Sequence, residues 1–286
     1  MSTVGLLLHH ERPQASELAR DAAAWLRERG HEVRVPAADA EVAGLEELAC
    51  ADDELAHELD LAVSLGGDGT MLRTVDLVAG AGVPVLGVNV GQLGYLTEVE
   101  PRSVRMALKR FLAGSYSIEP RMMLDVSVEA AGGECEQVPG AALNEAVLEK
   151  TPMGHTVRLE VIIDGDFFTT YAADGLIVAT PTGSTAYAFS ARGPIVAPEH
   201  RAILLTPVSP HMLFDRTLVL EPDSIVRLQV MGHRPATLSM DGRNLGTLHE
   251  GDAIVCTASK RSAKLVTFGG RNFHRILKRK FGLNDR

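Results

Sequence analysis

Residues 61–70 read LAVSLGGDGT, an uncharged apolar run that passes directly into a glycine-rich turn. A run such as Leu61–Leu65 is typical of a strand buried on both faces of a sheet. The pattern after the turn predicts a helix from Thr70 to Ala79. In open α/β sheets, ligands bind beyond the carboxyl ends of the strands, where glycines let backbone N–H groups approach an anion. This stretch therefore predicts an α/β fold with an anion site at the turn.

Strand and helix patterns alternate around this stretch. Strands are expected at 4–10, 31–36 and 83–90, helices at 14–29 and 103–113, and a loop with a helix in the acidic segment 38–58. Such alternation implies a parallel sheet with helices on its faces.

Short strands dominate after residue 115. They are expected at 123–130, 142–149, 157–163, 167–173, 176–180, 216–220, 225–229 and 253–258, with hairpin turns at Gly132-Gly133, Asp164-Gly165-Asp166 and Asp241-Gly242. We expect an α/β domain over residues 1–117 and a β-rich domain over 118–269. The segment 270–286 contains a basic amphipathic helix, Asn272–Phe281, which we expect to pack back onto the first domain.

Charge is unevenly placed along the 286 residues. The formal net charge is -9, and residues 1–60 hold 14 acidic and 5 basic side chains, so the remainder is neutral as a block. An acidic excess argues against a nucleic-acid binder, which needs a basic surface. No run approaches the ~20 apolar residues that span a bilayer, and the three separated cysteines fit a reducing cytosol. We expect no nucleic-acid partner, no membrane and a cytoplasmic location.

Three polar motifs stand out, each with a structural alternative. Asp68, within Gly66-Gly67-Asp68-Gly69-Thr70, would repel a phosphate unless Mg²⁺ or a substrate hydroxyl stood between them, so it is a candidate base or metal organiser; otherwise it caps a helix. The hydroxyl-rich turn 180–187, TPTGSTAY, either hydrogen-bonds a nucleotide or caps a helix. Asn144-Glu145, inside an apolar strand, either binds a ribose and an adenine edge or lies on an exposed edge strand.

Taken in order, these motifs resemble the NAD kinase family, in its bacterial ATP- or polyphosphate-dependent form. The matching segments are GGDGT at 66–70, GVNVGQLGYL at 87–96, LNE at 143–145, ADG at 173–175, TPTGSTAY at 180–187, GPIVAP at 193–198, TPVSPH at 206–211 and DG at 241–242. The resemblance covers roughly residues 4–281. It implies transfer of a phosphoryl group to the 2′-hydroxyl of the adenosine ribose of NAD, giving NADP, with ATP, another nucleoside triphosphate or polyphosphate as donor.

The resemblance also assigns residues. Asp68 is implied to accept the proton of the 2′-hydroxyl. The implied dinucleotide contacts are Asp68, Gly69, Asn144, Glu145, His155, Ala172, Asp174, Thr185, Ala186, Tyr187, Ala188, Phe189 and Ser190. The proposed phosphate-binding residues are Gly66, Gly67, Gly69 and Thr70, with Mg²⁺ held through the donor phosphates rather than by a recognisable set of ligands. The family is usually dimeric or tetrameric, so a homodimer or homotetramer is expected.

Three arginines leave alternatives open. Arg73, one helical turn after the glycine-rich turn, is a further candidate NAD contact that either reaches phosphate or forms a surface salt bridge. Arg192 stands where the family usually has glycine, and Arg243 stands where a glutamine is common. Arg192 would either contact phosphate or alter a subunit interface.

Two other functions share part of the pattern. A lipid or sphingoid kinase has the GGDGT-type turn but gives no reason for TPTGSTAY. A non-catalytic NAD-binding sensor would keep Asn144, Glu145 and Asp174 but leave Asp68 without a role.

Overall fold

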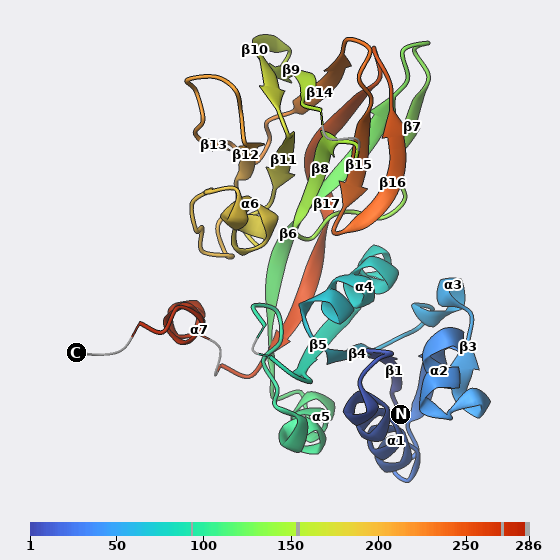
Figure 1. Ribbon diagram of the computed structural model, residues 1–286. Coiled ribbons are helices and arrows are strands. Elements are labelled where there is room, and N and C mark those ends of the chain that lie inside the picture. The colour runs from blue at the N-terminus through green and yellow to red at the C-terminus, as the bar shows by residue number, and fades with distance from the viewer. Residues whose placement is uncertain (93, 153–154, 270–271, 284–286) are drawn as a thin grey trace. The chain divides into compact units, whose positions relative to one another are not determined.

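The computed structural model describes residues 1–92, 94–152, 155–269 and 272–283. The chain divides into two compact units (Figure 1). Unit 1 comprises Met1–Pro120 and Ser262–Arg286, and unit 2 comprises Arg121–Arg261. An α/β N-terminal part and a β-rich C-terminal part confirm the predicted fold class. Among the described residues, no helix is long and apolar enough to cross a membrane.

Unit 1 contains a parallel sheet in the order β5-β4-β1-β2-β3. Its strands are β1 (Thr3–Leu8), β2 (Glu32–Pro36), β3 (Ala49–Cys50), β4 (Leu61–Gly66) and β5 (Pro84–Asn89), and β5 also pairs in parallel with the end of β17 (Ala253–Thr267). The helices are α1 (Pro13–Arg27), α2 (Ala37–Ala43), α3 (Asp52–Leu55), α4 (Asp68–Val78), α5 (Val104–Leu112) and α7 (Phe273–Lys280). All six residues of β4 are buried, as its uncharged sequence predicts.

The register of the parallel strands places three loops at one edge. Leu8 of β1 pairs with Leu65 of β4, and Gly66 of β4 pairs with Asn89 of β5. Because parallel strands end at the same edge, the residues that follow β1, β4 and β5 are neighbours there. Hydrogen bonds continue past the strand ends, from His9 N to Leu65 O at 3.0 Å and from Val90 N to Gly66 O at 2.9 Å.

Unit 2 contains two sheets with one core between them. The six-stranded antiparallel sheet has the order β13 (Leu218–Leu220), β12 (Ile203–Val208), β11 (Gly175–Ala179), β8 (Glu145–Lys150), β15 (Ala236–Met240) and β16 (Arg243–Leu248). The other sheet joins β10 (Asp166–Ala173), β9 (Val157–Ile163), β14 (Val226–Met231) and β17, with β6 (Ser117–Glu129) on β17 and β7 (Cys135–Gln137) on β6. Leu148 and Leu205 of the first sheet share a core with Leu159 and Leu228 of the second, as in a β-sandwich.

Several sequence predictions change at the element level. The strand expected at 253–258 runs on to Thr267, and the strand expected at 123–130 begins at Ser117. The strands β3, β7, β12, β15 and β16 have no counterpart among the predicted ones. The three hairpin turns are present. Asp164-Gly165 and Asp241-Gly242 both adopt positive φ at the two turn positions, 54° and 88° in one and 49° and 80° in the other, the geometry that favours Asp-Gly in tight hairpins.

Candidate functional site

A cavity of about 650 Å³ in unit 1 lies over the glycine-rich turn. It is lined by Leu8, His9, His10, Glu11, Arg12, Gly67, Asp68, Gly69, Thr70, Arg73, Gln92, Gly94 and Lys280. The lining combines the residues that follow β1, the start of α4 and the loop after β5. The cavity therefore occupies the sheet edge at which the sequence predicts an anion site.

Glycine occurs at positions 66, 67 and 69 of the turn for different structural reasons. A Cβ on Gly66 would lie 2.1 Å from Oγ1 of Thr70, so packing alone requires glycine there. A Cβ on Gly67 or Gly69 would meet nothing within 4 Å. Both of these glycines line the cavity, and their bare backbone suits close approach of an anion at the start of a helix. Their lack of a side chain is explained by a ligand better than by packing.

Asp68 is anchored to the loop after β5. Its Oδ2 accepts a hydrogen bond from Tyr95 N at 2.8 Å, and its Oδ1 accepts one from Leu96 N at 2.9 Å. The N-cap of α4 is Gly67, without a side-chain cap, so the helix-cap alternative for Asp68 is wrong. A Cβ on Gly94 would lie 2.1 Å from Asp68 Oδ1. Gly94 is thus needed for this contact, and the two amides hold the carboxylate in one orientation.

The loop after β5 also carries Tyr95, beside the carboxylate. Burial raises the pKa of the Tyr95 hydroxyl, and the negative charge of Asp68 raises it further. Lys280 of α7 lies with its Nζ 4.0 Å from the centre of the Tyr95 ring. The motif GVNVGQLGYL had no assigned role in the sequence; the structure shows that its second half positions Asp68.

Arg12 is a cavity residue that the sequence did not single out. Its guanidinium donates to the carbonyl of Val90, and a Cβ on Gly91 would fall within 1.4 Å of Arg12 Nη1. Gly91, at φ 126°, leaves the room that this side chain occupies. Within the described part of the chain, neither Arg12 nor Lys280 forms an ion pair with a carboxylate, so both cations remain able to contact an anion in the cavity. The Arg-Pro pair before the first helix was the only available signal.

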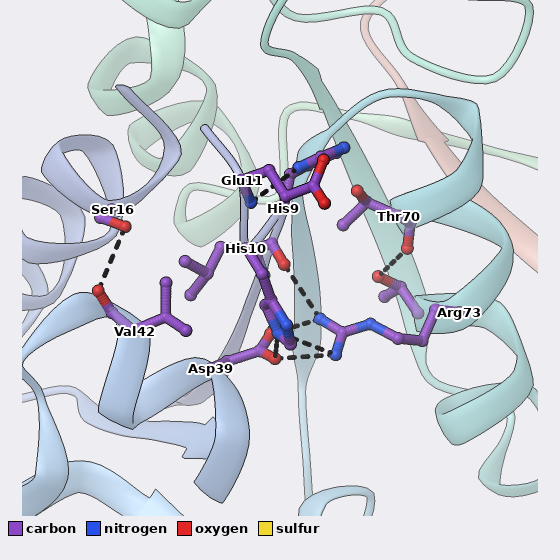
Figure 2. Close-up of polar contacts among 10 residues, drawn as sticks. His9, His10, Glu11, Ser16, Asp39, Val42, Thr70 and Arg73 are labelled. Atoms are coloured by element: carbon purple, nitrogen blue, oxygen red, sulfur yellow. Dashed lines mark hydrogen bonds and ion pairs between the residues drawn. The ribbon is translucent and has the colours of Figure 1, made fainter. Parts of the chain in front are cut away.

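Arg73 reaches the cavity wall but is already paired (Figure 2). Its Nη1 donates to Oδ1 of Asp39 at 2.7 Å and its Nη2 donates to the carbonyl of Leu8 at 3.0 Å. A second ion-pair contact joins Nη2 to Oδ2 of Asp39. Asp39 is fully buried, so this is not the surface salt bridge that the sequence left open. The sequence missed Asp39 because it lies in an acidic segment that resembles a solvated helix.

In unit 2, Asn144 and Glu145 lie at the start of β8, in the middle of the six-stranded sheet. The edge-strand alternative is therefore wrong. Asp241 holds this segment through its carboxylate, which accepts hydrogen bonds from the backbone N–H groups of Leu143 at 2.7 Å, Asn144 at 2.8 Å and Glu145 at 3.0 Å. The hairpin turn at Asp241-Gly242 thus fixes the position of the LNE motif.

Glu145 carries a buried carboxylate that is only partly satisfied. The residue is 7% exposed, and its Oε2 has no hydrogen-bond partner among the described residues. Burial raises the pKa of Glu145 to about 8, with a further increase from Asp241 and a partial offset from the backbone N–H of Tyr187. A buried acceptor without a donor is uncommon in folded proteins and marks a candidate ligand position.

The hydroxyls of the turn at 180–187 mostly serve the turn itself. Thr180 Oγ1 donates to Leu143 O at 2.6 Å and accepts from Gly183 N at 3.2 Å, and Ser184 Oγ donates to Pro181 O at 2.7 Å. Arg121 donates to Thr182 Oγ1 at 3.2 Å. These three hydroxyls are therefore used inside the fold, but not as helix caps, because neither the helical turn at 183–185 nor the one at 187–190 has a side-chain cap. A Cβ on Gly183 would lie 2.2 Å from the carbonyl oxygen of Asn144, so the glycine lets the turn pack against the LNE motif.

The predicted dinucleotide segment 185–190 presents a mixed surface. Thr185 and Ala186 are half-buried, and Tyr187, Phe189 and Ser190 are exposed around the short helix α6 (Tyr187–Ser190). Ala188 is fully buried in a core with Val147 and Leu204, so its side chain is not available to a ligand.

Tyr187 brings several predicted residues together. Its hydroxyl donates to Glu149 Oε2 at 3.3 Å. The pKa of this hydroxyl is raised, chiefly by burial and then by the charges of Glu149, Asp174 and Glu145. Asp174 also forms an ion pair with Lys150, with Nζ and Oδ1 2.8 Å apart. Glu145, Asp174 and Tyr187 therefore form one polar cluster in unit 2.

Two other predicted contacts have less support. The carbonyl of Ala172 on β10 already accepts a hydrogen bond from His211 N at 2.7 Å. His155 is exposed in the segment between β8 and β9. Neither residue shows a feature of its own that points to a ligand.

Backbone geometry explains one departure from the family pattern. Arg192 has φ 67°, in the left-handed region that favours glycine. Glycine is thus the unstrained residue at this position, and the exposed arginine adopts the same turn at a cost of about 1 kcal/mol or more. Arg243 is exposed at the start of β16.

These features define a class before any relative is considered. A glycine-rich turn after a buried parallel strand, a helix start, an oriented carboxylate and two cations that lack a carboxylate partner among the described residues are features typical of sites for the phosphate groups of nucleotides.

Sequence comparison then gives the family. Residues 4–116 match the ATP-NAD kinase N-terminal domain and residues 143–268 match the ATP-NAD kinase C-terminal domain. The chain is 44% identical over 283 residues to an NAD kinase of Heliobacterium modesticaldum, covering 98% of each chain. It is 39% identical to an NAD kinase of Moorella thermoacetica, covering 98% of this chain and 89% of the relative. The chain belongs to the NAD kinase family, whose members are enzymes that phosphorylate NAD.

Solved structures agree with this assignment. Yeast NADH kinase in complex with NADH has a TM-score of 0.91 at 26% identity, covering all of this chain and 89% of the other. An NAD kinase from Archaeoglobus fulgidus in complex with ATP has a TM-score of 0.76 at 23% identity, covering 99% of this chain and 100% of the other, which supports the fold. The family match favours an NAD kinase over a lipid or sphingoid kinase with a similar turn.

Proposed function

We propose that this protein transfers a phosphoryl group to the 2′-hydroxyl of the adenosine ribose of NAD, with ATP or another nucleoside triphosphate as donor, and that polyphosphate is an alternative donor. The observation that carries the proposal is Asp68, a carboxylate oriented by two backbone amides at the wall of a cavity built by a glycine-rich turn. Phosphoryl transfer needs positioning and charge neutralisation more than covalent chemistry.

The donor phosphates belong in the cavity of unit 1. Gly67 and Gly69 leave bare backbone there, the start of α4 supplies N–H groups, and Arg12 and Lys280 supply charge. Gly66 and Thr70 shape the turn by their close packing. These are the residues at which we place the phosphate chain.

A divalent metal, which the family generally uses, fits the carboxylates of this cavity. Among the described residues, no group of three or more His, Cys, Asp or Glu side chains is placed to hold a metal ion. Asp68 and Glu11 line the same cavity, and Mg²⁺ commonly takes one or two carboxylates together with substrate phosphates and water. We therefore assign Mg²⁺ to the donor phosphates with Asp68 or Glu11 nearby, where it would neutralise phosphate charge.

NAD binding belongs to the polar cluster of unit 2. The Oε2 of buried Glu145, which no described residue hydrogen-bonds, suits a ribose hydroxyl, which can donate to the carboxylate or accept from the protonated acid. Asn144 is half-buried, and no described residue bonds its side-chain amide, which leaves the amide for an adenine edge. We assign Asp174 to the nicotinamide end, the segment 185–190 to the adenosine half, and subsidiary contacts to Gly69, His155 and Ala172. Arg73, which lines the unit 1 cavity, is assigned to the donor phosphates rather than to NAD.

We assign Asp68 as the general base. Its two oxygens each accept one backbone N–H and each keep a second lone pair, so the group remains able to take the proton of the 2′-hydroxyl. General-base assistance is typically worth about 10²–10⁴ in rate.

The test replaces the proposed base, Asp68, with an amide of the same shape, so that the rest of the site is kept. Asp68→Asn is expected to keep the fold and NAD binding and to lower the turnover number about 10²-fold or more. The amide nitrogen cannot accept one of the two backbone hydrogen bonds, so the free energy of unfolding should fall by about 1 kcal/mol. NADP formation from NAD, Mg²⁺ and ATP is measured beside NAD affinity and thermal unfolding, and the wild type is repeated with polyphosphate.

Turnover by Asp68→Asn at a near-normal rate would show that the base is another group. A wild type that binds NAD but makes no NADP with either donor would support the non-catalytic sensor instead. We also propose a cytoplasmic homodimer or homotetramer, which sedimentation of the purified protein tests.

A further inference from the structure

Asp39 is a fully buried carboxylate on α2, and its hydrogen-bonding capacity is filled by three residues. Its Oδ1 receives His10 Nε2 at 2.7 Å and Arg73 Nη1 at 2.7 Å. Its Oδ2 accepts Leu8 N at 2.7 Å and pairs with Arg73 Nη2. Figure 2 shows His10 and Arg73 converging on this one side chain.

The three partners come from two walls of the same cavity. Leu8 and His10 belong to the end of β1 and the segment after it, and Arg73 belongs to α4, the helix that begins at Asp68. All three line the cavity, whereas Asp39 does not. Asp39 therefore joins the segment after β1 to the helix that carries the proposed base, from behind the cavity wall.

Arg73 is held with part of its donor set unused. Of its five N–H groups, Asp39 and Leu8 take both on Nη2 and one on Nη1. Among the described residues, the Nε–H has no partner, and the second Nη1–H has only a long contact, at 3.4 Å, with His10 Nε2, a nitrogen that also meets Asp39 Oδ1. The Arg73 side chain is 36% exposed. Its forked pairing with Asp39 sets the plane of the guanidinium, which a flexible arginine alone would not keep.

The buried ion pair of Asp39 and Arg73 is better explained by the orientation that it gives to its partners than by a gain in stability. Burying a carboxylate requires that its charge be paired, and a buried ion pair contributes little net stability compared with apolar packing. Three hydrogen-bonding partners on one buried carboxylate do, however, specify one orientation of the groups that they join. The benefit lies in the geometry of the cavity wall.

We propose that Asp39 is a positioning residue for the phosphate donor, which holds Arg73 and His10 at the wall of the unit 1 cavity so that the remaining N–H groups of Arg73 meet a phosphate oxygen. This inference rests on the proposed function of that cavity. Asp39 touches no substrate and acts through Arg73.

The test is a double-mutant cycle of Asp39→Asn, Arg73→Gln and the pair. Each single variant is expected to raise the KM for ATP at least tenfold while changing the KM for NAD and the turnover number at saturation less than threefold. Because Asp39 acts through Arg73, the double variant should have the same KM for ATP as Arg73→Gln alone, rather than the product of the two effects. Glu47→Gln, which breaks an exposed ion pair with Arg27 in the same unit, is the control and should change neither constant.

Binding of Mg-ATP and of inorganic tripolyphosphate, measured by calorimetry, separates this inference from the proposed function. Wild-type binding that weakens in Asp39→Asn supports the positioning role even if no NADP is formed. Equal affinity in wild type and Asp39→Asn overturns the inference while leaving NAD phosphorylation intact. If the wild type binds neither probe and makes no NADP, both proposals fail.

A second variant covers the case in which Asp39→Asn does not fold. Arg73→Lys keeps the positive charge opposite buried Asp39 but loses the fork that sets the guanidinium plane. It should still fold and should raise the KM for ATP at least fivefold with an unchanged KM for NAD. An unchanged KM for ATP in both Arg73→Lys and Arg73→Gln would refute the inference.

Discussion

The protonation of Glu145 affects the stability of unit 2. Burial and the neighbouring charge of Asp241 raise its pKa from the ordinary carboxyl value of 4.5 to about 8. Between these values the native protein keeps a proton that the unfolded chain has released. The contribution of Glu145 to stability is therefore fully present below pH 4.5 and is lost as pH rises through about 8.

Glu145→Gln should make the protein less sensitive to pH in this window, because the amide carries no charge at any pH. In the wild type without nucleotide, this one group lowers the free energy of unfolding by up to about 1.4 kcal/mol per pH unit. Urea unfolding at pH 5.5 and pH 8.5 measures the difference for both proteins. Other titrating groups are common to both proteins, so equal pH dependence would contradict the raised pKa.

At the scale of elements, some glycines in the turn and at the start of α4 are required by packing, whereas others face the proposed ligand site. Gly66 is fixed by Thr70, whereas Gly69 lies inside the helix, where glycine is a poor helix former, and faces open space. Close contacts also explain why glycine stands at 91 and 94: a Cβ on Gly91 would meet Arg12, and a Cβ on Gly94 would meet Asp68. The sequence shows four such glycines in two motifs without showing which of them serve packing.

Gly69→Ala should therefore separate stability from activity. Alanine favours the helix by up to about 1 kcal/mol, so thermal unfolding should stay the same or occur at a higher temperature. The added Cβ occupies space assigned to the donor phosphates, and kcat/KM for ATP should fall at least tenfold, or about 1.4 kcal/mol. Gly80→Ala, another glycine whose Cβ would meet open space, is the matched control and should keep full activity. A fully active Gly69→Ala would contradict the assignment of the donor phosphates to this turn.

The candidate site was partly predictable at this scale. Asp68, Glu145 and the hairpin at Asp241-Gly242 were found because their signals are local: a run of glycines, a polar pair in an apolar strand, and an Asp-Gly turn. Arg12, Asp39 and the role of Asp241 were missed because each acts on a distant segment; Asp39 meets Arg73 across 34 residues and Asp241 meets Asn144 across 97. The hydroxyls of Thr180 and Ser184 looked like ligand groups, but their partners are backbone carbonyls within the fold.

For the whole molecule, net charge is a poor guide to ligand choice. The net charge of -9 resides in the first sixty residues, and that segment also contributes His9, His10, Glu11 and Arg12 to the cavity. Anion binding at the turn relies on nearby backbone N–H groups and on individual cations. Exposed carboxylates farther than about 8 Å are largely screened at physiological ionic strength.

Removing two surface charges should thus leave catalysis unchanged. Glu17→Gln together with Glu46→Gln changes two exposed side chains outside the cavity and takes the formal net charge from -9 to -7. The KM values for ATP and NAD should each stay within twofold at 150 mM salt. A clear fall in the KM for ATP would show that the acidic N-terminal segment opposes donor binding through its overall field.

The sequence by itself determined the two-part fold, the glycine-rich turn and the family, because buried apolar runs, hairpin glycines and motif order are properties of neighbouring residues. Only the tertiary structure decided which side chains are available to a ligand and which are used by the protein itself. Among the described residues, it paired Arg73 with Asp39, gave Arg12 a backbone carbonyl but no carboxylate, and buried Glu145 with one oxygen unbonded. The physical reason is that a polar group's role depends on the donors and acceptors around it, and those are brought together by strand order and register.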